Sequence, residues 1–280
     1  MTEPGKTVSL GILGCGNIGG AVADAVLSGR INARVDWIVD KGPSDRLRGI
    51  MERTSPAPHY SPDPDALVES SVEAVFEAAH PSVVREYAVP IVRSGKDLIL
   101  MSVGGLIEGE TLTALHEAAR DSGRCVMIAA GAVSGLSALR AARISGALDS
   151  AIIRTTKSPA SLAGAPFFVE HPMALNHRDE KLLVFSGSVA EGIGGFPKNA
   201  NVAAAVALAG LGPAETQMQI YVDPGVSRTE HAVEASGSFG ELSLRMKSSP
   251  CPENPRTSYL AVLGAISAVD QYVAGIFLGI

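Results

Sequence analysis

A glycine-rich segment near the start of the chain has the spacing of a phosphate-binding loop. It fits the pattern G-x-G-x-x-G directly behind a short apolar run, Val8 to Leu13. In such a loop the first glycine allows a tight turn, the second lets a pyrophosphate approach the backbone, and the third lets the next helix pack closely. Backbone N–H groups at the start of that helix then face the phosphates. The residues expected to bind a dinucleotide here are Gly14, Gly16, Asn17, Ile18 and Gly19.

An acidic residue follows at the distance typical of a dinucleotide site. A second apolar run, Val35 to Val39, ends at Asp40, about 20 residues beyond the last glycine, where a carboxylate can accept hydrogen bonds from an adenosine ribose. Its charge would repel a 2′-phosphate, which favours NAD. Three basic residues close behind could neutralise that phosphate and leave NADP open, or could form a solvated basic loop: Lys41, Arg46 and Arg48.

The first half of the chain alternates apolar runs with helical patterns. Strands and helices are expected, in alternation, over residues 72–79, 81–92, 97–103, 112–122 and 125–131. This order predicts an α/β fold with a Rossmann-type, doubly wound parallel sheet whose ligands lie at the carboxyl ends of the strands. Ala79 and His80 fall at such an end and are expected to line the nucleotide site. His80 precedes Pro81, and we interpret it as a residue that begins a helix rather than as a catalytic group.

The second half changes to strands in which polar and apolar residues alternate. Such strands are expected over residues 150–159, 181–188, 214–224 and 231–246. They predict an α+β domain with a mainly antiparallel sheet, covered by helices at 136–144 and 201–209. The proline-rich stretches 55–64 and 250–255 are interpreted as loops.

Three parts of the chain are expected from these patterns. Residues 1–132 would form the dinucleotide-binding domain and residues 133–250 the substrate domain. Residues 251–280 would supply a C-terminal helix, capped by Thr257 or Ser258, that returns to the nucleotide domain or to an interface.

Composition narrows the class of protein. The chain has 280 residues, 46% of them hydrophobic and 19% charged, and a net charge of −6 with scattered basic residues, which argues against a nucleic-acid surface. No apolar run reaches the length of about 18 residues that a membrane span needs, and no signal peptide is recognisable, so we expect a cytoplasmic protein. Its three cysteines have neither disulfide nor zinc spacing, so no metal is expected.

Five segments together resemble the L-aspartate dehydrogenase family. They are EAAHPSVVREYAVPIVRSGKDLILMSVGGL (77–106), GAVSGLSAL (131–139), FPKNANVAAAVALAG (196–210), DPGVSRTEHAVEASGSFG (223–240) and ENPRTS (253–258). The resemblance implies an NAD(P)-dependent oxidation of L-aspartate to iminosuccinate, which hydrolyses to oxaloacetate and ammonia or enters NAD biosynthesis. The reverse reaction is the reductive amination of oxaloacetate with ammonia. The resemblance also favours a homodimer.

The resemblance assigns roles to single residues. The catalytic histidine of the family matches His231, and two of its nucleotide contacts match Ala132 and Asn201. Thr229 stands where related sequences often carry an asparagine, which leaves strict aspartate specificity open.

The chemistry of the implied reaction is consistent with a histidine. Hydride can leave the α-carbon only when the amine is neutral, and an imidazole with a pKa near about 6.5 can take up the proton and return it. The two carboxylates of L-aspartate need cationic or amide partners. Candidates for these partners are Thr155, Thr156, Lys157, Lys198 and Asn199, and the other options are Arg228, Arg245 and Arg256.

Two other functions stay open at this point. The first is a dehydrogenase or imine reductase for another amino acid, with the same nucleotide site and a different pocket. The second is a non-catalytic NAD(H)-binding redox sensor, for which Cys15 inside the glycine loop would be the reactive group.

Overall fold

The structure, a computed structural model, describes residues 7–173, 175, 180–197 and 200–278. They form two compact units. The first contains the residues up to Gly131 together with those from Ala261 onward, and the second contains Ala132–Leu260. The return to the first unit thus falls at residues 260–261, whereas the sequence prediction ends the second domain at residue 250. Among the described residues, no helix combines the length and the apolar character needed to cross a membrane.

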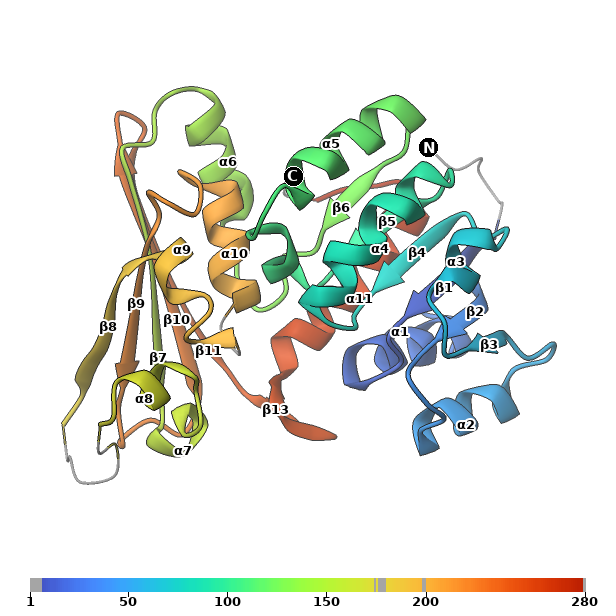
Figure 1. Cartoon of the computed structure of the whole chain (residues 1–280), viewed down its shortest axis with the longest axis horizontal. Coiled ribbons are helices and arrows are strands. Elements are labelled where there is room, and N and C mark those ends of the chain that lie inside the picture. The colour runs from blue at the N-terminus through green and yellow to red at the C-terminus, as the bar shows by residue number, and fades with distance from the viewer. Residues whose placement is uncertain (1–6, 174, 176–179, 198–199, 279–280) are drawn as a thin grey trace. The chain divides into compact units, whose positions relative to one another are not determined.

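The first unit is built on a six-stranded parallel sheet (Figure 1). Its strands are β1 (Val8–Leu13), β2 (Ala33–Val39), β3 (His59–Ser61), β4 (Ala74–Glu77), β5 (Asp97–Leu100) and β6 (Val126–Ile128). They lie in the order β3-β2-β1-β4-β5-β6, so the chain changes direction across the sheet between β1 and β4. This strand order confirms the predicted Rossmann-type sheet. In open α/β sheets ligands bind at such a switch point.

Helices cover both faces of this sheet. They are α1 (Asn17–Leu27), α2 (Asp45–Arg53), α3 (Asp65–Glu69), α4 (Pro81–Arg93), the short 3-10 helix η1 (Val103–Leu106), α5 (Thr111–Ser122) and α11 (Tyr259–Ala274). Apolar residues of α1, α2 and α11 join those of β1 and β2 in one core, in which Val22 and Val269 are fully buried. Tyr272 of α11 also donates a hydrogen bond to Asp97 of β5, at 2.8 Å. The C-terminal helix is therefore part of the nucleotide-binding unit.

Two expectations for this unit were wrong in detail. The stretch 55–64, interpreted as a loop because of its prolines, contains β3. β3 is an edge strand that pairs only with β2, and prolines are tolerated next to such a strand because one of its sides needs no ladder partners. The strand expected over 97–103 ends at Leu100, since the chain turns into η1 at Val103.

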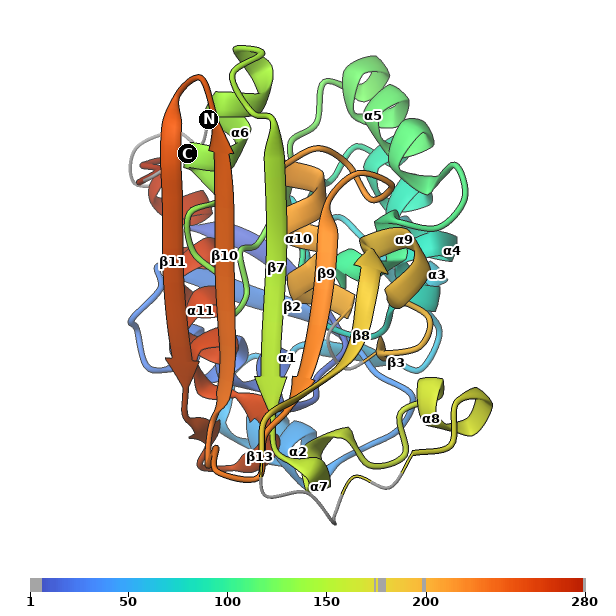
Figure 2. The same cartoon turned by 90° about the vertical axis from the view of Figure 1, so that its left-hand side faces the viewer.

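The second unit contains a five-stranded mixed sheet (Figure 2). The strands are β7 (Ser150–Lys157), β8 (Leu182–Ser188), β9 (Gln217–Val222), β10 (Thr229–Gly237) and β11 (Gly240–Ser248), in the order β11-β10-β7-β9-β8. All neighbours are antiparallel except β7 and β9, which are parallel, so the mainly antiparallel prediction is confirmed. Figure 2 shows α6 and α10 behind the strands.

Helices of the second unit are mostly short. They are α6 (Leu136–Ile144), α7 (Pro159–Leu162), α8 (Phe167–Glu170), α9 (Val189–Gly192) and α10 (Ala200–Ala209). The predicted strand at 231–246 is a hairpin of β10 and β11, because Gly240, at a φ of +108°, lets the chain reverse between them. The predicted loop at 250–255 was also wrong, since it contains β12 (Pro250–Cys251) and the start of β13 (Asn254–Ser258), which pair with each other.

Candidate active site

The three glycines of the loop after β1 are each explained by a different structural requirement. Gly14 has a φ of +93°, and a Cβ there would lie 2.7 Å from the Cα of Ala79. A Cβ on Gly19 would lie 1.9 Å from the carbonyl oxygen of Gly14, so this glycine lets α1 pack directly behind the loop. A Cβ on Gly16 would meet nothing within 4 Å, which leaves space beside the backbone where a phosphate can approach.

The start of α1 has the character of an anion site. Gly16 is the N-cap, the first turn contains no acidic residue, and Asn17 and Ile18 are the first two residues of the helix. The backbone N–H groups of such a turn carry partial positive charge and have no partners within the helix. The residues present therefore fit the pyrophosphate of a dinucleotide.

Asp40 is fixed at the end of β2 by the loop itself. Its Oδ2 accepts a hydrogen bond from the backbone N–H of Cys15, at 2.6 Å. The loop is thus tied to the carboxylate predicted to bind the ribose. Burial of the Cys15 side chain, and secondarily the charge of Asp40, raises the pKa of the Cys15 thiol to about 11.

A second buried carboxylate, Glu77, was not singled out from the sequence. It ends β4 and is 1% exposed. Its oxygens accept hydrogen bonds from the backbone N–H groups of Ala79, at 2.8 Å, and Ser102, at 2.9 Å. Burial raises the pKa of the Glu77 carboxyl, and these hydrogen bonds oppose that rise. Glu77 therefore holds together the two loops that follow β4 and β5 at the ligand-binding edge of the sheet.

The other residues predicted to bind the nucleotide lie in different settings. Ala79 and His80 are exposed after β4, and His80 is the N-cap of α4, its Nδ1 accepting a hydrogen bond from the backbone N–H of Ser82 at 3.2 Å. The capping interpretation of His80 is confirmed. Ala132 is buried after β6, and Asn201 is an exposed residue in the first turn of α10.

The second candidate centre is His231 on β10. It is 4% exposed, and its Nδ1 lies 2.9 Å from the hydroxyl oxygen of Thr155 on the neighbouring strand β7. Burial, and secondarily the positive charge of Lys157, lowers the pKa of the imidazole to about 4. The ring is therefore neutral at physiological pH and can accept a proton.

Strand alternation decides which neighbours share a face with this histidine. His231 pairs with Thr155 in the register of β10 and β7, and Lys157 follows two residues later on the same side of β7. Thr156, predicted as a substrate ligand, pairs with Glu230 and faces the opposite side of the sheet. The structure therefore brings Thr155 to His231 in place of Thr156. Neighbouring residues of a strand face opposite sides of the sheet, and the sequence alone does not show which of two adjacent threonines lies on the side of His231.

Two further predicted substrate ligands, Lys198 and Asn199, lie outside the described residues. Within the part of the chain that the structure describes, no group of three or more histidine, cysteine, aspartate or glutamate side chains could hold a metal ion.

Comparisons with known proteins match both units. The family model for the homoserine dehydrogenase NAD binding domain matches residues 14–129, and the model for the aspartate dehydrogenase C-terminal domain matches residues 137–272. L-aspartate dehydrogenase of Methanosarcina acetivorans is 33% identical, with 97% of this chain and 99% of that protein covered. The enzyme of the same name from Methanocella arvoryzae is 36% identical, with 96% and 98% covered.

A solved structure has the same fold over nearly the whole chain. The aspartate dehydrogenase of Thermotoga maritima superposes with a TM-score of 0.72 at 23% identity, covering 96% of each chain. With the NAD-binding sheet, the glycine loop and the second α+β unit, the protein is an NAD(P)-dependent amino acid dehydrogenase. The chain belongs to the L-aspartate dehydrogenase family.

Buried His231 makes stability depend on pH in a defined direction. The unfolded chain binds the proton at a pKa near about 6.5, whereas the folded chain binds it only near about 4. Stability is thus complete above the unfolded value and decreases as the pH falls toward 4, by up to about 3 kcal/mol. Urea unfolding at pH 7.5 and at pH 4.5 should show a smaller decrease for His231→Gln than for the unaltered protein. The exposed His116, changed to glutamine, is the matched control, and an equal effect of both substitutions would contradict the assignment.

Cysteine reactivity follows from burial. The Cys15 thiol is 1% exposed and protonated at pH 8, while Cys125 is exposed at the start of β6. Burial, and secondarily the charge of Asp97, raises the pKa of the Cys125 thiol as well. Because Cys125 is exposed, iodoacetamide at pH 8 should modify it in the folded protein and reach Cys15 only after unfolding. Peptide mass mapping over a time course measures both rates. Alkylation of Cys15 as fast as that of Cys125 would instead favour the redox-sensor hypothesis.

Proposed function

We propose that the protein oxidises L-aspartate to iminosuccinate with NAD(P) and catalyses the reverse amination of oxaloacetate, with His231 as the acid–base group. The observation that carries this proposal is the buried, neutral imidazole held by Thr155 on a sheet that the family model matches. The curated relatives are named for this activity.

Thr155 holds the His231 ring through Nδ1, which leaves Nε2 as the nitrogen that we propose acts as the base. When Nδ1 carries the proton and donates it to the Thr155 oxygen, Nε2 retains its lone pair and can take a proton from the ammonium group of the substrate. The amine lone pair then forms the C=N bond as the hydride leaves the α-carbon. The nicotinamide of NAD(P), when bound, would supply the hydride acceptor. Nε2 returns its proton to solvent, or to the amine in the reverse direction.

Lys157 prepares the same face for an anionic substrate. Its positive charge is one of the two causes that lower the pKa of His231, so it acts within electrostatic reach of the imidazole. A substrate carboxylate bound by Lys157 would offset that charge, which raises the pKa of the imidazole toward the value a base needs. Lys198 and Asn199 remain proposed partners for the second carboxylate.

The pyrophosphate and the ribose of the proposed nucleotide site lie in the first unit. The pyrophosphate binds at Gly14, Gly16 and the start of α1, and Asp40 accepts hydrogen bonds from the adenosine ribose. Further contacts are proposed at Ala79, His80, Ala132 and Asn201. Feeding of iminosuccinate into NAD biosynthesis is part of the same proposal.

We also propose a cytoplasmic homodimer. The C-terminal helix α11 supports this, because Tyr259, Leu260 and Leu263 are exposed large hydrophobic residues on it. Size-exclusion chromatography with light scattering should give twice the chain mass of 28.9 kDa. A monomer at micromolar concentration would contradict the dimer and leave the enzymatic proposal intact.

The activity is tested by the absorbance of reduced nicotinamide with NAD or NADP at alkaline pH, where the amine is largely neutral. Turnover is expected with L-aspartate and not with L-glutamate, L-alanine or D-aspartate. His231→Ala should lower kcat by about 10²- to 10⁴-fold with little change in nucleotide binding, because general acid–base catalysis contributes about that factor. Thr155→Val, which keeps the shape and removes the hydroxyl, should lower kcat less and shift the pH profile of kcat/KM.

Thr156→Val is the matched control, since this residue faces the other side of the sheet. An equal loss in Thr155→Val and Thr156→Val would mean that the hydroxyl near His231 has only a structural role. Turnover with another amino acid would favour the alternative dehydrogenase, and tight NADH binding without any turnover would favour the sensor.

A further inference from the structure

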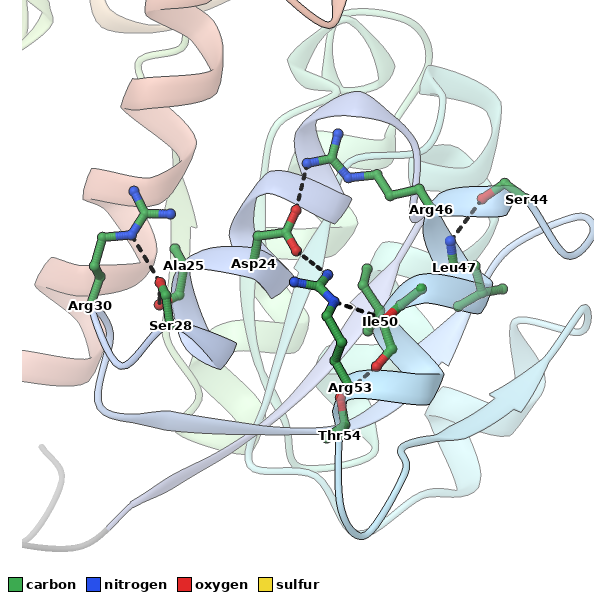
Figure 3. Close-up of polar contacts among 11 residues, drawn as sticks. Asp24, Ala25, Ser28, Arg30, Ser44, Arg46, Leu47, Ile50, Arg53 and Thr54 are labelled. Atoms are coloured by element: carbon green, nitrogen blue, oxygen red, sulfur yellow. Dashed lines mark hydrogen bonds and ion pairs between the residues drawn. The ribbon is translucent and has the colours of Figure 1, made fainter.

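A carboxylate on α1 binds two arginines of α2 (Figure 3). Asp24 accepts hydrogen bonds from Arg46 at 2.8 Å and from Arg53 at 2.5 Å, one through each carboxylate oxygen. The side chains of Asp24 and Arg46 are 28% and 24% exposed. Since charges so placed are only partly screened by water, the pKa of the Asp24 carboxyl lies below its ordinary value: the two arginines outweigh the cost of burial.

This Asp24 clamp, formed with Arg46 and Arg53, lies beside the phosphate-binding loop. The Arg46 side chain crosses α1 so closely that a Cβ on Gly20 would lie 2.2 Å from its Nε. The charges of Asp40, Arg46 and Asp24 all act on the Cys15 thiol inside the loop. The backbone N–H of Cys15 in turn binds Asp40. The clamp and the ribose-binding carboxylate therefore belong to one electrostatic environment.

The charges of this environment decide what the adenosine ribose can carry. A 2′-hydroxyl needs only an acceptor, which Asp40 supplies. A 2′-phosphate would bring negative charge to Asp40 and needs a compensating cation. Arg46 is a basic residue of α2 within reach of the loop, but its charge is opposed by Asp24. Arg48, the next basic residue of α2, is 57% exposed in its ion pair with Asp45, so water screens its charge whether or not the pair forms.

We propose that Asp24 is a specificity-determining residue for the cofactor: by binding Arg46 and Arg53 it withholds their positive charge from the ribose edge, so that the site takes NAD in preference to NADP. The inference rests on the proposed placement of the ribose at Asp40. It adds a second determinant, on a different helix, to the acidic residue at the end of β2. Neutralising Asp24 leaves two arginine charges uncompensated and raises the electrostatic potential at the 2′ position.

The test is a fluorescence titration of the full-length protein with NADH and NADPH, without substrate. The unaltered protein should bind NADH more tightly. Asp24→Asn should lower the ratio of the NADPH to the NADH dissociation constants by about tenfold, mainly through tighter NADPH binding. Asp24→Glu, which keeps the charge, should retain most of the preference for NADH.

Two controls separate this effect from a general change in charge. Asp45→Asn removes the same charge from α2 next to Arg46 and should leave the ratio within about twofold, since Asp45 is fully exposed to screening water. Arg46→Ala added to Asp24→Asn should reverse much of the shift, because it removes the cation that Asp24 opposes.

Three outcomes would overturn the inference. The unaltered protein could bind NADPH more tightly than NADH, or Asp24→Asn could bind NADH with an unchanged ratio of the two dissociation constants. The third outcome is a change of this ratio in Asp45→Asn as large as that in Asp24→Asn. Failure of the unaltered protein to bind either nucleotide would instead refute the nucleotide site of the proposed function, and the inference with it. Binding of NADH by each variant shows that it is folded.

Discussion

The close approach of the loop after β1 to the loop after β4 is the constraint on which the nucleotide-binding unit depends. Gly14 lies so near Ala79 that no side chain fits between them, and its positive φ excludes most other residues. Glu77 in turn fixes the loop after β4, because its oxygens accept hydrogen bonds from backbone N–H groups of the loops after β4 and β5. Because both loops are fixed before any ligand arrives, the edge of the sheet is organised in advance for an anion.

In the second unit, burial fixes the protonation state of one side chain, His231. A solvated imidazole near pH 7 would be a mixture of charged and neutral forms and of two tautomers. Burial removes the charged form, and the hydroxyl of Thr155, 2.9 Å from Nδ1, holds the ring in one orientation while it can pair with either tautomer. The positive charge of Lys157 lowers the pKa of the imidazole further, so an anion bound at Lys157 would raise that pKa.

Local patterns predicted the parts of the fold that depend on sequence neighbours. The strand Val8–Leu13 and the helix Leu136–Ile144 agree with prediction because their apolar periodicity matches the face that each buries. The edge strand β3 was missed, since proline content says nothing about whether a partner strand lies alongside. Glu77 was missed as well, because an acidic residue at the end of a short apolar run gives no local sign that distant backbone N–H groups will bind it.

The charges behind Asp40 illustrate the same limit more sharply. From the sequence, Arg46 and Arg48 were equivalent neighbours of Asp40, the carboxylate predicted to bind the ribose. In the structure they differ, because one crosses to Asp24 on α1 while the other pairs within its own helix with Asp45. Only the packing of α2 against α1 produces this difference, since Asp24 is 22 positions away in sequence. The charge that a cofactor meets is therefore a property of paired side chains, and counting basic residues after a strand overestimates it.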